Sequence, residues 1–173
     1  IDIKRCDLLK LFWESGITDI QDSRNVFSLE LADNDILESQ YPFLAGSMSS
    51  SSALTDIAKY IYDDKVSTDG KTVVVDWYYK KTIQDSENEY GLPVTKTVLH
   101  YCKFCNGEVL YASENDPAME KGWYEHGKYP FVFDVMFPEE GTPAGFGYID
   151  IMKDCQMYID KMGQAILKNA YLG

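Results

Sequence analysis

A long amphipathic helix at the end of the sequence is the feature that most constrains the fold. Mostly apolar residues recur there at steps of three and four, which places their side chains on one face of an α-helix. The residues of this stripe are Ile149, Met152, Gln156, Ile159, Met162, Ile166 and Ala170. We expect the helix to begin near Phe146 or Tyr148. Because a small sheet domain is too short to cover such a stripe, we expect it to pack against another subunit or against sequence outside this chain.

The segment before this helix predicts a strand. Residues 129–137 are rich in aromatic and β-branched residues, and a loop with Gly and Pro follows at 141–147. In an extended chain, alternate residues from Phe131 onward share one face, while Val132 and Met136 occupy the other. Apolar residues on both faces indicate a central strand or a strand that is covered twice.

Three further segments predict an antiparallel meander. Residues 71–83 contain the run Val-Val-Val-Asp-Trp-Tyr-Tyr, whose β-branched and aromatic side chains favour a strand. Residues 94–104 and 108–112 flank the dipeptide Asn106-Gly107, which is typical of a two-residue hairpin turn. We therefore expect three consecutive strands that pair as neighbours.

The first part of the chain predicts shorter elements. Residues 1–6 and 24–31 alternate between apolar and polar types, which indicates strands. Asp33 is a candidate N-cap for a short helix that ends before Pro42. The serine-rich residues 46–52 offer little apolar surface to offset the entropy of ordering, so they predict a mobile loop.

The predicted fold is α+β, with a mixed, mainly antiparallel sheet, short helices and one long C-terminal amphipathic helix. We expect residues 1–145 to form the sheet region and residues 146–173 the helix. The expected core combines the apolar positions of the most strand-like segments: Val73, Val75, Trp77, Val98, Val109, Phe131, Phe133 and Val135. The sequence begins with Ile rather than Met, which leads us to expect a piece of a longer protein.

The charge of the chain argues against binding to nucleic acid. It carries 28 acidic and 16 basic residues, for a net charge of -12. Nonspecific affinity for DNA comes mainly from cations that displace the counterions of phosphates, and this chain has no excess of cations. Charge alone would also fit an acidic mimic of DNA. No apolar run is long enough to predict a membrane span, and no signal peptide is evident.

The cysteines allow one alternative function. Four cysteines without a secretion signal favour free thiols in a reducing compartment. Cys102 and Cys105 have the spacing of half a zinc knuckle, with His100 and His126 as candidate further ligands. A strand that ends at an Asn-Gly turn produces the same spacing without a metal. The alternative is therefore a small cytosolic binding module with a zinc knuckle.

The sequence does not predict an enzyme. It contains no phosphate-binding loop, no dinucleotide-binding glycine pattern, no Gly-x-Ser-x-Gly motif and no His-Glu-x-x-His motif, so we expect no catalytic residues and no cofactor. Trp123 and Tyr124 are candidate interface residues, since Trp and Tyr dominate contact hot spots. Equally, the two rings could close one end of the sheet core.

Two stretches near the end carry a family resemblance: Gly122-Trp-Tyr-Glu-His-Gly-Lys-Tyr-Pro-Phe-Val and Gly145-Phe-Gly-Tyr-Ile-Asp-Ile-Met-Lys-Asp-Cys-Gln-Met-Tyr-Ile-Asp-Lys. A third stretch lies upstream, Thr18-Asp-Ile-Gln-Asp-Ser-Arg-Asn-Val-Phe. In their residues, order and spacing, the three stretches resemble the portal proteins of tailed bacteriophages and of prophages in low-GC Gram-positive bacteria.

The resemblance implies a structural role in a virus particle. Portal proteins form a homo-oligomeric ring, typically of about twelve subunits, at one vertex of the capsid. The ring nucleates head assembly, docks the terminase motor and lets DNA enter and leave. By this resemblance the chain spans the wing region and the helix that leads toward the stem, without the clip, the crown and most or all of the stem. Its partners would be terminase, head-completion and capsid or scaffold proteins, in the host cytoplasm and then in the virion.

Overall fold

The computed structural model describes residues 2–46, 48 and 69–172. Contacts divide the chain into two compact units. The sheet unit comprises Ile1–Glu14 and Gln21–Pro130, and the helix unit comprises Ser15–Ile20 and Phe131–Gly173. Of the predicted mobile loop at 46–52, only Gly46 and Met48 lie within the described residues.

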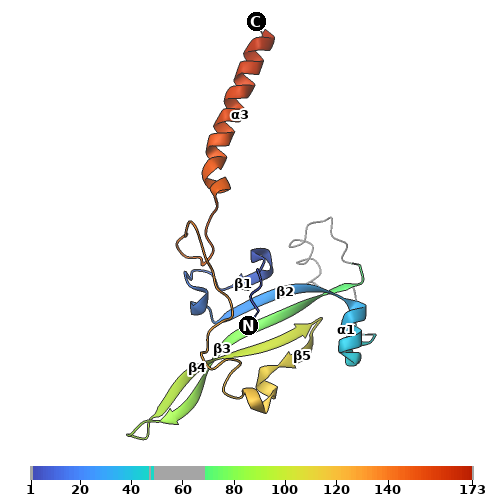
Figure 1. Ribbon diagram of the computed structural model, residues 1–173, viewed down its shortest axis with the longest axis vertical. Helices are drawn as coiled ribbons and strands as arrows, with labels where there is room; N and C mark the ends of the chain where they lie inside the picture. The colour runs from blue at the N-terminus through green and yellow to red at the C-terminus, as the bar shows by residue number, and fades with distance from the viewer. Residues whose placement is uncertain (1, 47, 49–68, 173) are drawn as a thin grey trace. The chain divides into compact units, whose positions relative to one another are not determined.

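The sheet unit is built on a five-stranded antiparallel sheet in which each strand pairs with its neighbours in sequence (Figure 1). The strands are β1 (Leu11–Trp13), β2 (Asn25–Asp33), β3 (Lys71–Glu87), β4 (Pro93–Cys105) and β5 (Glu108–Ala112). The α+β fold and the meander are confirmed. The pairings between these strands are all antiparallel, so the described sheet is not mixed.

Among the described residues, the helices are short apart from the last one. The short helices are η1 (Leu8–Lys10), η2 (Ile20–Asp22), α1 (Asn34–Gln40), η3 (Pro42–Leu44), η4 (Ser113–Asn115) and η5 (Pro117–Met119). In the helix unit, α3 runs over Tyr148–Leu172 and confirms the predicted terminal helix. It begins at one of the two predicted positions.

Local sequence signals explain how these elements start and stop. Asp33 occupies the N-cap position of α1, as predicted, although its carboxylate forms an ion pair with Lys71 at 3.2 Å rather than a side-chain cap bond. Pro42 lacks an N–H and begins η3 after a single intervening residue, Tyr41, which caps the end of α1. Between β4 and β5, Asn106 and Gly107 both have positive φ angles, of 48° and 86°, as the predicted hairpin turn requires.

The sheet buries apolar residues on both faces. One cluster contains Leu29, Val73 and Val75, and the other contains Leu37, Leu44, Val74 and Cys105. Consecutive residues of β3 belong to opposite clusters because side chains alternate along a strand. α1 supplies Leu37 and η3 supplies Leu44, so these two short helices cover the second face.

The core of the sheet unit was predicted in part. Three of its predicted members are buried, namely Val73, Val75 and Val98. Trp77 is only half-buried, and Val109 is 52% exposed because β5 is the last strand of the sheet. The prediction missed Val26 and Leu99, which are fully buried. A sheet that is covered on both faces buries consecutive residues of one strand. The predicted core instead contained mainly every second residue of each strand.

Two predicted strands do not form. Residues 2–7 are irregular, and Lys4 pairs with Asp2 at 3.4 Å on the surface of the unit. Residues 131–136 join no strand, and a single isolated bridge links Phe137 to Phe146. A strand needs a partner edge, which one short alternating pattern cannot supply.

The alternation in the second of these segments is nevertheless present. Its three predicted core residues, Phe131, Phe133 and Val135, are half-buried and belong to the helix unit. Val132 and Met136 are exposed, so the prediction of a segment covered on both faces is wrong. An extended backbone is enough to alternate side chains in this way.

Candidate interaction surfaces

The start of α3 is fixed by its own first turn. The N–H of Gly147 donates to the Asp150 carboxylate at 3.0 Å, which satisfies one of the donors that a helix N-terminus leaves unpaired. A carboxylate in the first turn is also favourable at the positive end of the helix dipole. The sequence between residues 147 and 150 therefore specifies where α3 begins.

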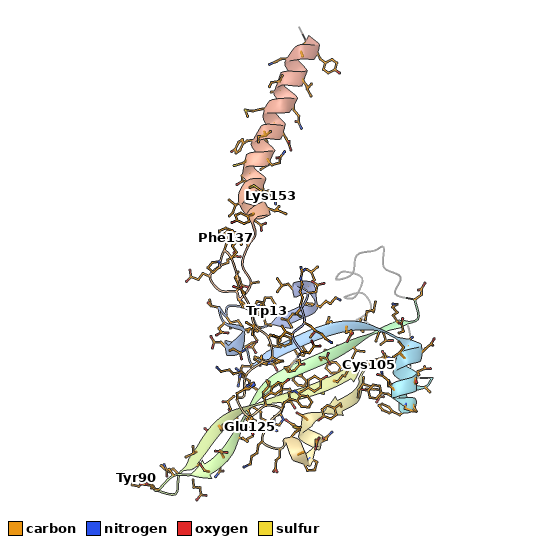
Figure 2. The ribbon with its side chains drawn as sticks, in the orientation of Figure 1. Trp13, Tyr90, Cys105, Glu125, Phe137 and Lys153 are labelled. Carbon is orange, nitrogen blue, oxygen red and sulfur yellow. The ribbon has the colours of Figure 1, made fainter. Side chains whose placement is uncertain are left out.

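An aromatic clasp precedes this helix start. The N–H of Phe146 donates to the carbonyl oxygen of Phe137 at 3.1 Å, and the two rings stack with centroids 5.4 Å apart. The Tyr148 ring meets Phe137 edge-on at 5.2 Å. Figure 2 labels Phe137 beside the first turn of α3. The clasp thus joins the extended segment to the helix within one unit.

Gly145 is required by the close approach inside this clasp. A Cβ atom at this position would lie 2.0 Å from the Phe137 carbonyl oxygen and 2.2 Å from Cγ1 of Val135. Both distances are far below van der Waals contact, and one of the two atoms belongs to the backbone. Only glycine fits here without moving the chain.

Beyond the clasp, α3 exposes its side chains along its whole described length. The predicted interface residues Ile149, Met152, Ile159, Met162 and Ile166 are each more than half exposed. At about 100° per residue, Met152, Ile159 and Ile166 fall within an arc of about 40°. At the same spacing, Ile149 lies about 60° beyond one end of this arc and Met162 about 40° beyond the other. The helix therefore presents a continuous apolar stripe.

Sequence reasoning missed one member of this stripe. Cys155 is exposed and lies between Met152 and Ile159 on the same face. With Cys155 included, the steps from Met152 to Ile166 alternate as three, four, three and four, which is the spacing of a coiled-coil seam. The sequence contained this signal, but the choice of Gln156 in place of Cys155 obscured it.

The other candidate interface residues lie over the sheet. The N–H of Trp123 donates to the carbonyl oxygen of Leu99 at 2.6 Å, on a part of β4 that β5 does not reach. The Trp123 ring packs against Tyr101 and Tyr111, with centroids 4.9 Å and 5.7 Å away. Tyr124 meets Trp123 edge-on at 6.1 Å. Both rings are half-buried, and this arrangement favours a role in closing the sheet core.

His100 and Ser113 form a buried polar pair in the same region. The Ser113 hydroxyl accepts the N–H of Tyr101 at 2.9 Å and lies 3.1 Å from Nδ1 of His100. Burial lowers the pKa of His100, the Glu114 carboxylate opposes this shift, and the charge of Lys81 adds to it. A neutral ring can accept the hydroxyl proton of Ser113 at Nδ1. The pair therefore satisfies its own hydrogen bonds inside the core.

This pair does not make a catalytic centre, although a serine, a histidine and a carboxylate are close together. Ser113 is fully buried and His100 is 3% exposed, so a substrate cannot reach either side chain. Glu114 is held by Lys81 at 3.0 Å. A nucleophile needs an accessible reacting atom as well as a neighbouring base.

The candidate zinc ligands do not converge. β4 pairs with β3 in a regular register at this point, where Cys102 lies opposite Trp77 and Cys105 lies opposite Val74. Three residues apart on a strand, the two thiols point to opposite faces of the sheet and cannot share one ion. Burial raises the pKa of both thiols, which opposes the thiolate form that zinc binds. Over residues 2–46, 48 and 69–172, no three His, Cys, Asp or Glu side chains are grouped as metal ligands.

The other candidate ligand, His126, makes a local contact. Its Nδ1 accepts the N–H of Lys128 at 3.0 Å, and its ring stacks on Tyr124 with centroids 5.1 Å apart. These contacts fix the turn that carries Tyr124. They are the local hydrogen bonding expected of a loop histidine.

No family model matches this chain, and no curated protein matches it. In the described ranges, every helix falls short of the length and apolarity that crossing a bilayer demands.

Proposed function

We propose that this chain is part of a phage portal subunit, with its sheet unit in the wing of the ring and α3 leading toward the stem. The resemblance of the three sequence stretches names the family. The observation that carries the proposal is the exposed apolar stripe of α3, centred on Met152, Ile159 and Ile166. A large exposed apolar patch marks an interaction site, and a ring supplies a neighbouring subunit for it.

The charges along α3 support contact between copies. The helix contains three aspartates and three lysines, namely Asp150, Asp154, Asp160, Lys153, Lys161 and Lys168, so its formal charge is zero. The whole net charge of -12 therefore lies outside α3. Helices from several acidic subunits can then meet along α3 without net repulsion between them.

The acidity of the remainder suits a conduit for DNA. A subunit of this net charge offers no excess of cations to phosphates, so DNA can pass the ring without being held by nonspecific contacts. The proposal assigns no sequence-specific recognition and no reaction to this chain. In this family, ATP hydrolysis belongs to the terminase, which would dock on the assembled ring together with head-completion and capsid or scaffold proteins.

Electron microscopy of the purified complete gene product tests the proposal. We expect closed rings with a central channel and about twelve subunits, since head-to-tail contacts that close produce cyclic symmetry. A matched pair of double variants tests the role of α3. Ile159→Glu with Met162→Glu should prevent rings, whereas Lys161→Gln with Gln164→Glu adds the same negative charge on the opposite face and should leave them intact. Single particles of one subunit size in the parent protein would reject the proposal.

A further inference from the structure

The hairpin formed by β3 and β4 extends beyond the rest of the sheet. β2 pairs with β3 only over residues 71–79, and β5 pairs with β4 only over residues 102–105. Within residues 82–97 the two strands pair only with each other. Their pairing runs from Thr82 opposite Thr97 to Glu87 opposite Pro93. We call residues 82–97 the hairpin arm. Figure 1 shows the ends of β3 and β4 running past β2 and β5.

The loop at the end of the arm is held by one residue. The side-chain oxygen of Asn88 accepts the N–H groups of Tyr90 and Leu92, each at 2.9 Å. Its backbone N–H donates to the Leu92 carbonyl oxygen, and its carbonyl oxygen accepts the N–H of Gly91, again at 2.9 Å each. The loop therefore has a defined shape before any partner binds. Such preorganisation reduces the entropy lost on binding.

This preformed loop displays apolar side chains to solvent. Tyr90 is 86% exposed and Leu92 is 60% exposed, and Val94 behind them is also exposed. Figure 2 shows Tyr90 at the far end of the arm. Single exposed apolar residues are common, but here two lie in the loop and a third, Val94, follows near the start of β4. We call these three residues the apolar knob. Tyrosine offers a large contact area with few rotatable bonds, which suits an anchor.

The knob is surrounded by negative charge. The hairpin arm contains Asp85, Glu87 and Glu89. The sequence has no lysine or arginine between Lys81 and Lys96. The ion pairs of the described residues involve other carboxylates. A surface that receives this knob therefore needs cations at its rim.

The edges of the arm are poor sites for strand addition. The register of the two strands shifts between Gln84 and Ser86, which marks a bulge, and Pro93 has no N–H to donate. Lys81 and Lys96 place charges beside the free edges. Bulges, prolines and lysines are the features with which sheet proteins discourage edge pairing. The side chains of the tip, rather than its backbone, are left to make contact.

We propose that the knob formed by Tyr90, Leu92 and Val94 docks into an apolar pocket rimmed by lysine and arginine on a different protein of the same particle. A second copy of this chain is a poor host because the part of it outside the neutral helix α3 carries the whole net charge of -12. The choice of host rests on the proposed function, since the partner is sought among the other structural proteins of a virus particle.

Photocrosslinking from the knob tests this docking. The probe is p-benzoylphenylalanine in place of Tyr90 in the complete protein, produced together with the structural proteins of its virus. The same probe in place of Val109, an exposed residue of β5, is the matched control. We expect an adduct with one other protein from position 90 alone, in a peptide that contains lysine or arginine. Leu92→Ser, and separately Glu87→Gln with Glu89→Gln, should each lower the yield about tenfold.

Three results would overturn the docking proposal. They are an adduct yield no higher than at the Val109 position, an adduct between copies of this chain, and an adduct peptide without basic residues. Electron microscopy of the same preparation separates the two proposals. Rings without the adduct reject only the docking, whereas the adduct without rings rejects only the portal assignment.

Discussion

Phe137 and Phe146 stack with ring planes inclined by only 13° and are also joined by a backbone hydrogen bond of 3.1 Å. The backbone of Phe137 lies so close to Gly145 that there is no room for a side chain at that position. A contact of this kind couples the extended segment before residue 137 to the first turn of α3. The direction in which α3 leaves this segment therefore depends on a single glycine.

Gly145→Ala should destabilise the clasp. The added methyl group would meet the Phe137 carbonyl oxygen at 2.0 Å, and overpacking of this kind costs about 1 to 3 kcal/mol. Gly163→Ala is the control, because that position lies within α3 with nothing within 4 Å of the added atom. It should stabilise the helix by about 1 kcal/mol. Denaturant titration followed by far-UV circular dichroism measures both, and equal effects of the two changes would contradict the account of the clasp.

The two faces of the sheet lead to a prediction about its core. Leu99 is fully buried in β4, so Leu99→Ala should cost about 2 to 5 kcal/mol of unfolding free energy. Val109 is 52% exposed in β5, and Val109→Ala should change stability by no more than about 0.5 kcal/mol. Urea titration of the two variants decides this. A larger loss at Val109 would mean that the register of β4 and β5 is misassigned.

Burial of His100 predicts that stability falls in acid. Its pKa lies below the ordinary value of 6.5 because burial disfavours the charged ring, and the nearby charges are Glu114 in η4 and Lys81 in β3. The unfolded chain then binds more protons than the folded chain once the pH falls below about 6.5. The contribution of His100 is complete above this pH and decreases as the pH falls toward the lowered pKa.

The measurement is the urea midpoint as a function of pH. The parent protein should lose stability between about pH 6.5 and the lowered pKa of His100, and His100→Gln should reduce this dependence, because the titrating group is removed. An unchanged pH profile in the His100 variant would show that other groups cause the loss.

The net charge gives a prediction about DNA. The protein should bind duplex DNA negligibly at physiological salt, because its net charge of -12 has the same sign as the phosphates. A gel-shift assay with a duplex of mixed sequence is sufficient. Submicromolar binding would contradict the proposal that DNA passes the ring without being held.

The elements that were predicted correctly depend on local patterns. The Asn106-Gly107 turn, the β-branched run in β3 and the apolar spacing of α3 are each specified by residues close in sequence. β3 extends past its predicted end at residue 83 to Glu87, because the polar residues of the hairpin arm are paired yet exposed. Strand propensity reflects burial and packing, so it is weak in such an arm.

The features that were missed depend on distant partners. An alternating pattern predicted a strand before α3, but the pattern did not contain the edge that a strand requires. The position of Trp123 over Tyr101 and the division of Cys102 and Cys105 between two faces follow from the register of the sheet. The exposure of the α3 stripe was expected from its length, and the contribution of Cys155 was overlooked.

Sedimentation velocity of the purified protein tests most directly whether α3 is an assembly surface. We expect the parent protein to self-associate and Ile159→Glu with Met162→Glu to abolish this, because unpaired charges are costly in an apolar interface. The far-UV circular dichroism spectrum of the variant should match that of the parent protein, which shows that the sheet is still folded. The control variant Lys161→Gln with Gln164→Glu should associate like the parent protein. A strict monomer for the parent protein at all concentrations would show that α3 is not an assembly surface.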